Sequence, residues 1–196
     1  HEAGHASVSW LLEFANPLVK VTIVPRGKAL GAAWYLPEER QLTTKEQMLD
    51  EMCSLLGGRA AEEVCFGKVS TGALNDLERA TKMAYAMVVY YGMSDKLKNI
   101  SFYDSTQADY SFTKPYSDKT AEIIDQEMQN IVSEQYERAK SIIASNRDKH
   151  EELANLLVEN EVIFTEDVER IFGKRPWVSR MDELMNENKK NENKDP

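Results

Sequence analysis

Residues 1–15 read HEAGHASVSWLLEFA, and this opening stretch decides how the rest of the chain is interpreted. Its apolar residues fall at the spacing of one helix face. They are Ala6, Val8, Leu11, Leu12 and Phe14. The pattern stops at Asn16-Pro17, because proline lacks a backbone N–H and clashes with the preceding helical turn. We therefore predict one helix from residue 1 to about residue 15.

Two histidines and a glutamate lie at the start of this helix. His1 and His5 are one helical turn apart, so both imidazoles project from the same face and can share one zinc ion. Glu2 lies beside them, where its carboxylate can take a proton from a water activated by the metal. Two of the three histidines in the chain fall in this motif, which disfavours an incidental cluster on a solvated helix start. The pattern is that of a zinc peptidase.

A catalytic zinc site needs a third protein ligand, and the residues alone leave several candidates. Peptidases with a longer motif would have Gly and His where this chain has Val8 and Leu11. Thermolysin-like enzymes would have a helical Glu where this chain has the turn at residues 24–26. Both types are excluded. The remaining candidates are the acids Glu62, Glu63 and Asp76 and the third imidazole, His150.

Helical patterns dominate the remainder of the chain. Two β-prone runs, residues 19–24 and 30–36, flank a Pro-Arg-Gly turn and predict a hairpin. A helix is predicted from Thr43, with Glu46 completing a capping box, toward Phe66, and close packing against another element is the expected reason for Gly57-Gly58 inside it. Further helices are predicted over residues 76–91, 117–145, 148–160 and 165–172, the last capped by Thr165. The fold class is therefore mainly α, with a small β-hairpin near the metal site.

The apolar content indicates one folded unit followed by a polar tail. We expect a zinc metallopeptidase domain over residues 1–177, of which residues 116–172 form a C-terminal helical part. Residues 178–196 are rich in Asn, Lys and Glu and carry too little apolar surface to order themselves, so a disordered tail is predicted there.

Composition excludes some classes of partner and compartment. The formal net charge of -9 argues against nucleic acid and favours protein partners. Cys53 and Cys65 match neither a disulfide framework nor a structural zinc site, which favours free buried thiols in a reducing compartment. No apolar run approaches the roughly 20 residues of a membrane span. Because the chain opens inside a predicted helix, we expect an excised fragment, with any membrane anchor or motor upstream.

Several stretches resemble the FtsH proteases in order and spacing, and the resemblance covers residues 1 to about 177. They are His1-Glu2-Ala3-Gly4-His5, Val24-Pro25-Arg26-Gly27 with Leu30-Gly31, Gly57-Gly58-Arg59-Ala60-Ala61-Glu62-Glu63, Ser70-Thr71-Gly72-Ala73-Leu74-Asn75-Asp76-Leu77, Tyr91-Gly92-Met93-Ser94, Ile124-Asp125-Gln126-Glu127 and Glu161-Val162-Ile163.

The resemblance implies roles that spacing alone does not assign. It implies Asp76 as the third zinc ligand, although on residue grounds Asp76 also suits a helix N-cap. It implies that Glu62 supports the site from behind the ligands, where a solvated helix acid is the plain alternative. It further implies hydrolysis of unfolded proteins, an AAA+ ATPase module upstream, a homo-hexamer and a membrane anchor. The location would be the cytoplasmic face of a bacterial inner membrane, or an organelle membrane.

The second β-prone run is a candidate substrate-binding strand, through Gly31, Ala32, Ala33 and Trp34. An unpaired strand edge offers backbone hydrogen bonds to an extended polypeptide whatever its sequence. The alternative is a hairpin that merely covers the core.

Two rival functions are alternatives to peptide hydrolysis. The first is a non-catalytic oligomerisation module, driven by the helices after Ser117, with a structural or vestigial zinc site. The second is a copper enzyme with an N-terminal histidine, which the mid-helix position of His1 disfavours. Glu2 and an open zinc position favour catalysis. No Gly-x-x-x-x-Gly-Lys-Ser/Thr loop occurs in the sequence, so the expected ATPase is not encoded in these residues.

Overall fold

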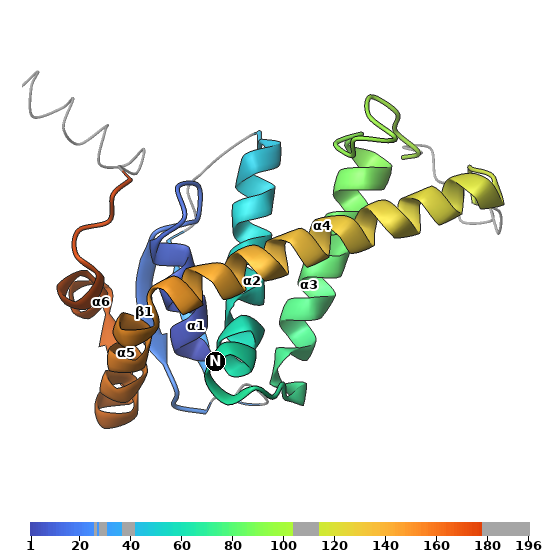
Figure 1. Cartoon of the computed structure of the whole chain (residues 1–196). Coiled ribbons are helices and arrows are strands. Elements are labelled where there is room, and N and C mark those ends of the chain that lie inside the picture. Colours follow the sequence, from blue (N-terminus) through green and yellow to red (C-terminus); the bar gives the residue numbers. More distant parts are fainter. Residues whose placement is uncertain (26, 28–30, 37–41, 104–113, 178–196) are drawn as a thin grey trace, which may run out of the picture.

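A computed structural model describes residues 1–25, 27, 31–36, 42–103 and 114–177. Helices dominate this part of the chain and a small sheet accompanies them, which confirms the mainly α fold class (Figure 1). The elements are α1 (Glu2–Trp10), β1 (Leu18–Thr22), β2 (Ala32–Tyr35), α2 (Lys45–Phe66), the 3₁₀ turn η1 (Thr71–Ala73), α3 (Leu74–Tyr85), its π-helical continuation η2 (Ala86–Tyr90), α4 (Asp118–Ser145), α5 (Arg147–Asn160), β3 (Val162–Phe164) and α6 (Thr165–Phe172).

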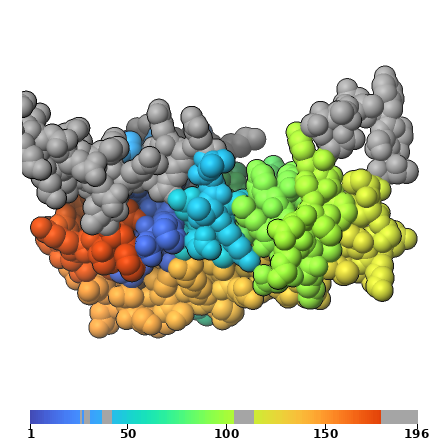
Figure 2. All heavy atoms as spheres, turned by 90° about the horizontal axis from the view of Figure 1, so that it is seen from above, coloured from blue at the N-terminus to red at the C-terminus, as the bar shows by residue number. Residues whose placement is uncertain are grey.

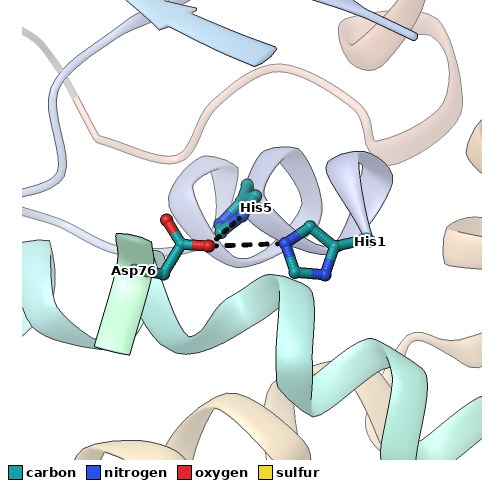
Figure 3. Close-up of side chains that lie close together, drawn as sticks. All are labelled: His1, His5 and Asp76. Atoms are coloured by element: carbon teal, nitrogen blue, oxygen red, sulfur yellow. Dashed lines mark hydrogen bonds and ion pairs between the residues drawn. The ribbon is translucent and has the colours of Figure 1, made fainter. Parts of the chain in front are cut away.

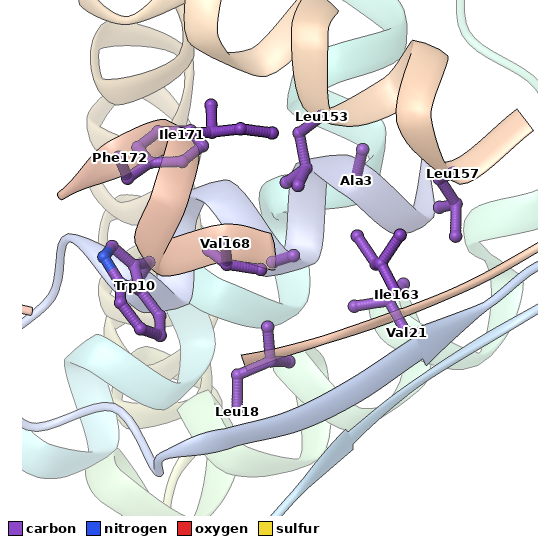
Figure 4. Packing of buried hydrophobic residues seen from close by; sticks show 11 residues of the cluster. Ala3, Trp10, Leu18, Val21, Leu153, Leu157, Ile163, Val168, Ile171 and Phe172 are labelled. Carbon is purple, nitrogen blue, oxygen red and sulfur yellow. The ribbon is translucent and has the colours of Figure 1, made fainter. Parts of the chain in front are cut away.

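Helix α1 lies between the sheet and α2, and it is buried from Ala3 to Trp10. One side of it packs against β1, β3, α5 and α6 around an apolar cluster (Figure 4). That cluster is Ala3, Ala6, Trp10, Leu18, Val21, Leu153, Leu157, Ile163, Val168, Ile171 and Phe172. Apart from Glu2 and His5, α1 carries only small or apolar residues, which suits a helix with neighbours on both sides.

The other side of α1 approaches the backbone of α2 through glycine. A Cβ placed on Gly4 would come 2.4 Å from the carbonyl oxygen of Gly57, and a Cβ on Gly57 would come 2.8 Å from that of Gly4. Side chains at either position would therefore push the helices apart. The close packing expected at Gly57 and Gly58 is confirmed.

Helix α4 crosses α2 and α3 and ties them to the C-terminal helices. Figure 1 shows it running diagonally over both, and Figure 2 shows the red-orange C-terminal residues at one end of the molecule and the yellow start of α4 at the other. Three further apolar clusters lie beneath or beside it. Met52 and Met87, both fully buried, share the one between α2, α3 and α4.

The predicted hairpin is present, and it belongs to a sheet of three strands. β1 pairs antiparallel with β2, and it also pairs antiparallel with β3, in the order β2-β1-β3. We did not predict β3, because three residues are too short to show an alternating pattern. Its middle residue, Ile163, is fully buried in the cluster of Figure 4. Burial against α1 and α5 therefore supports this strand.

The first helix ends earlier than predicted, at Trp10 instead of about residue 15. Its continuation is held by distant side chains: Phe14 N–H donates to Asp50 Oδ2 over 2.9 Å, and Arg175 donates to the carbonyl oxygens of Leu12 and Ala15. Leu12 and Ala15 are buried against α2 and α4. The apolar residues after Trp10 are thus buried as predicted, but the segment that carries them is irregular and not helical.

Two predicted caps were wrong by a small shift. Helix α2 is capped by Thr44, not Thr43, with Gln47 closing the capping box. Helix α6 does not take Thr165 as its cap, because the Thr165 hydroxyl donates to the carbonyl oxygen of Leu18 over 2.7 Å. Asp167 accepts from the N–H of Phe164, the residue before the helix.

Some predictions fall on residues outside the described ranges, namely Arg26 and Leu30 of the hairpin and the whole tail 178–196. Among the described helices, none combines the length and apolarity needed to cross a bilayer. Both cysteines are free: Cys53 is buried as expected, and Cys65 is only partly so.

Candidate metal centre

Three side chains from two elements meet at the first turn of α1 (Figure 3). His1 is the N-cap of α1, His5 lies one turn on, and Asp76 lies in the first turn of α3. Asp76 Oδ2 lies 3.4 Å from His1 Nε2 and 3.5 Å from His5 Nε2. One ligand atom from each residue lies within 4.8 Å of the others, the arrangement of a site that could hold a metal ion. Asp76 is not the N-cap that its sequence context also suited, because α3 begins at Leu74.

The second ring nitrogen of each histidine is bound on the side away from this cluster. His1 Nδ1 lies 2.8 Å from Glu62 Oε1, and His5 Nδ1 lies 2.9 Å from the carbonyl oxygen of Ser54. Both partners are acceptors, so each Nδ1 carries the proton and each Nε2 presents its lone pair to Asp76. Three electron-rich atoms at this spacing repel one another unless a proton or a cation lies between them. The donor set therefore fits a borderline cation such as zinc.

When a proton instead of a cation lies between these atoms, the imidazoles and the carboxylate shift the pKa values of one another. The hydrogen bond to Asp76, more than any other cause, raises the pKa of His1 above its ordinary value, against the effect of burial. Burial alone would raise the pKa of Asp76, but the bonds to His1 and His5 outweigh it and hold that pKa well below the usual range. Asp76 is therefore ionised throughout the neutral range.

The floor of the site is the backbone of α2 at Gly58. A Cβ at that position would lie 2.6 Å from His1 Nε2 and 2.7 Å from His5 Nε2. Only glycine leaves both rings where they are. The sequence signal for this role was the Gly57-Gly58 pair, which we had interpreted as helix packing alone.

Glu62 is fixed on its own side by Ser70. The Ser70 N–H donates to Glu62 Oε2 over 2.7 Å, and its hydroxyl donates to Oε1 over 2.9 Å. Burial raises the pKa of Glu62, but the two Ser70 bonds and the bond from His1 outweigh it, so the pKa is lowered. Sequence reasoning missed Ser70, because its eight-residue separation from Glu62 is not a spacing that predicts contact, and it missed the Ser54 carbonyl, because a backbone acceptor leaves no mark in a sequence.

Glu2 lies next to the cluster without joining it. Burial, more than any other cause, raises the pKa of Glu2, while the charges of His5 and His1 pull it down. The start of the β2 segment lies against it: a Cβ at Gly31 would come 2.7 Å from Glu2 Oε1. The carboxylate is thus partly desolvated and remains beside the place where the three ligand atoms converge.

These residues line a cleft of about 1150 Å³. One wall comes from the hairpin, through Gly31, Ala32, Ala33 and Tyr35, and another from the segment leading into α3. Trp34 does not line the cleft; it is half-exposed and stacks under Lys20, whose Nζ lies 5.2 Å from the ring centroid. Three of the four predicted substrate residues therefore lie at the cleft.

The other candidate ligands lie elsewhere. Glu63 contacts the Tyr136 hydroxyl and Lys140 on α4. The His150 ring is buried on α5, with Nδ1 3.0 Å from the Ser7 hydroxyl. Neither belongs to the group of metal-binding atoms found in the described residues.

Comparison with known proteins adds a family and several relatives. The model of the family described as Peptidase family M41 matches residues 1–171. The chain is 69% identical to an ATP-dependent zinc metalloprotease FtsH of Parabacteroides distasonis, over 94% of this chain and 27% of that protein. It is 55% identical to the FtsH protease of Rhodothermus marinus, over 90% of this chain and 26% of that protein.

A mitochondrial relative extends the comparison to eukaryotes. The chain is 47% identical to a mitochondrial inner membrane m-AAA protease component of Mus musculus, over 92% of this chain and 22% of that protein. The chain thus spans about a quarter of the length of the curated relatives that it matches.

Proposed function

This chain belongs to peptidase family M41, and we propose that it hydrolyses peptide bonds with a zinc ion bound by His1, His5 and Asp76. The observation that carries the proposal is the convergence of two imidazole nitrogens and one carboxylate oxygen within 4.8 Å, with both Nδ1 atoms already bound to acceptors. Three protein ligands leave the fourth position of a tetrahedral zinc open, which distinguishes catalytic from structural sites.

Glu2 is the proposed general base. A zinc ion at this site supplies the positive charge that polarises the scissile carbonyl and makes a water acidic enough to react near neutral pH. Glu2 accepts the proton of the attacking water and passes it to the leaving amine. Its raised pKa suits this exchange, because a base works best when its pKa approaches the operating pH.

The hairpin edge is the proposed substrate strand. Within the described residues β2 pairs on one side only, with β1, and Gly31, Ala32 and Ala33 line the cleft that contains Glu2. An extended polypeptide can add to the open edge through backbone hydrogen bonds, which favours unfolded proteins of varied sequence as substrates.

The relatives support a wider setting for this chain. The two bacterial relatives are named as ATP-dependent zinc metalloproteases, and the mouse relative as an m-AAA protease component of the mitochondrial inner membrane. We accordingly propose that in its full-length context the chain works with an AAA+ ATPase module, in a homo-hexamer anchored to a membrane. In a bacterium this places it at the cytoplasmic face of the inner membrane.

The test combines metal analysis with cleavage of an unstructured peptide. Glu2→Gln should keep its zinc content and lose roughly 10² or more in rate, because it removes proton transfer and leaves the ligands intact. Asp76→Ala should lose zinc to a mild chelator far faster than wild type. Asp118→Ala is the matched control, because Asp118 lies in the first turn of α4 and is exposed.

Each result has a definite meaning. Normal cleavage by Glu2→Gln would remove Glu2 as the base, and equal zinc retention in Asp76→Ala and Asp118→Ala would remove Asp76 as a ligand. Zinc binding without any cleavage by the wild-type chain would favour the non-catalytic assembly module instead.

A further inference from the structure

We propose that Ser70 is a positioning residue that holds the metal centre together from two sides. Through Glu62 it fixes the ring of His1, and through the turn that it caps it fixes the start of the helix that carries Asp76. This inference rests on the proposed function, because it assigns Ser70 a purpose only if His1 and Asp76 bind a metal.

The first side is the carboxylate of Glu62. Ser70 binds both of its oxygens, Oε2 through the backbone N–H and Oε1 through the hydroxyl. A carboxylate held at both oxygens cannot rotate. Oε1, which the Ser70 hydroxyl contacts at 2.9 Å, is also the atom that lies 2.8 Å from His1 Nδ1. Ser70 therefore orients the His1 ring through the carboxylate of Glu62.

The second side is the segment that leads from Ser70 to Asp76. Ser70 is the N-cap of η1, where its hydroxyl oxygen accepts from the Gly72 N–H over 3.2 Å. The turn η1 passes directly into α3, whose first turn contains Asp76. The Ser70 carbonyl oxygen is itself held by the Arg59 guanidinium on α2, at 3.1 Å. The start of this segment is thus fixed relative to α2.

The chemistry requires a hydroxyl. The Ser70 oxygen accepts from the Gly72 N–H through a lone pair and donates its one proton to Glu62, because an ionised carboxylate can only accept. Alanine loses both bonds and keeps only the backbone N–H to Oε2. Threonine keeps both, and its branched Cβ suits the extended backbone of Ser70, φ -115° and ψ 176°. Comparing Ser70→Ala with Ser70→Thr therefore distinguishes the effect of losing the hydroxyl from the effect of changing the size of the side chain.

The experiment measures zinc affinity by competition with a chromogenic chelator. Ser70→Ala should bind zinc roughly tenfold more weakly than wild type, the lower end of the range for partners of ligating residues, because one of its two bonds to Glu62 survives. Ser70→Thr should bind within about twofold of wild type. The matched control is Ser117→Ala, because Ser117 caps α4 by accepting the Thr120 N–H and lies outside the cleft.

Thermal unfolding of the metal-free forms separates positioning from folding. Ser70→Ala and Ser117→Ala each lose one serine cap, so their metal-free midpoints should fall by similar amounts, while only Ser70→Ala loses zinc affinity. Wild-type affinity in Ser70→Ala, or an equal loss in Ser70→Thr, would overturn the inference.

The proposed function fails by a different result. It fails if Asp76→Ala binds zinc as well as the wild-type chain, whatever the Ser70 variants do. If Asp76→Ala loses zinc and Ser70→Ala does not, the metal site stands and only the role of Ser70 is rejected.

Discussion

At the scale of single residues, His150 shows how a buried imidazole outside the metal centre makes stability depend on pH. It lies on α5 at 4% exposure and contacts the Ser7 hydroxyl on α1. Burial, above all, lowers its pKa from 6.5. The folded state therefore resists protonation at pH values where the unfolded chain accepts it. The contribution of neutral His150 to the unfolding free energy is fully present above pH 6.5. It is lost as the pH falls from 6.5 toward the lower pKa of His150 in the folded state.

We predict that His150→Gln flattens this dependence. Denaturant unfolding of both proteins, with excess zinc, should show a steeper loss of unfolding free energy below pH 6.5 in the wild type. The difference in slope for one proton cannot exceed about 1.4 kcal/mol per pH unit. Parallel curves would mean that His150 binds its proton equally in both states.

The proposed metal centre was predictable from sequence only where its residues are local. His1, Glu2 and His5 stand in one turn of a helix, so their spacing indicates their geometry. Asp76 is brought to them by tertiary packing, and on residue grounds alone it matched a helix cap as well as a ligand. Only the family resemblance singled it out.

At the scale of elements, two adjacent glycines of α2 serve different neighbours and offer a matched pair of variants. Gly57 faces the backbone of α1, where a Cβ would lie 2.8 Å from the Gly4 carbonyl oxygen and 3.1 Å from Val8 Cγ2. Gly58 faces the rings of His1 and His5. The same substitution at neighbouring positions should therefore damage different properties.

We predict that Gly57→Ala lowers the unfolding free energy, because overpacking costs about 1–3 kcal/mol. The higher helix propensity of alanine offsets roughly 1 kcal/mol of this loss. Gly58→Ala should instead weaken zinc binding roughly tenfold or more, because the imidazoles are the parts that can move. Chemical denaturation of the metal-free forms and chelator competition measure the two effects. If both variants lose stability and zinc in parallel, the division between packing and metal cradle is wrong.

Elements with long periodic patterns were predicted well, and the exceptions have physical reasons. The helix over 117–145 was recovered nearly to the residue, because its amphipathic pattern spans many turns and Ser117 caps it. The end of α1 was missed because Asp50 and Arg175, far away in sequence, satisfy the backbone that a helix would otherwise satisfy. β3 was missed because tertiary burial, not its three residues, determines it.

At the scale of the whole molecule, the proposed metal centre lies where two packed regions meet. Helix α1 joins the cluster with the sheet, α5 and α6 on one side, and the cluster with α2 and α4 on the other. The cleft opens along this junction, with the hairpin and α5 lining one part and the α2–α3 segment another. The three proposed ligands come from α1 and α3, so the site forms only when both of these helices have packed against α2.

This placement limits what the chain can cleave by itself. A scissile bond must reach Glu2 and the ligands between the hairpin and the start of α3, which only an extended segment can do. Folded proteins expose such segments rarely, because global opening costs about 5–15 kcal/mol. No Gly-x-x-x-x-Gly-Lys-Ser/Thr loop is present in the 196 residues to bind ATP in the usual way.

We therefore predict that these residues alone cleave short peptides and permanently unfolded chains but spare a stable folded protein, and that ATP changes neither rate. The comparison uses one protein in its folded form and in a permanently unfolded form, with and without nucleotide, at equal zinc content. Glu2→Gln serves as the control for contaminating proteases, because it should lose the cleavage and keep the zinc. ATP-stimulated loss of the folded substrate would require a nucleotide site within these residues, and it would contradict the view that unfolding is supplied by another module.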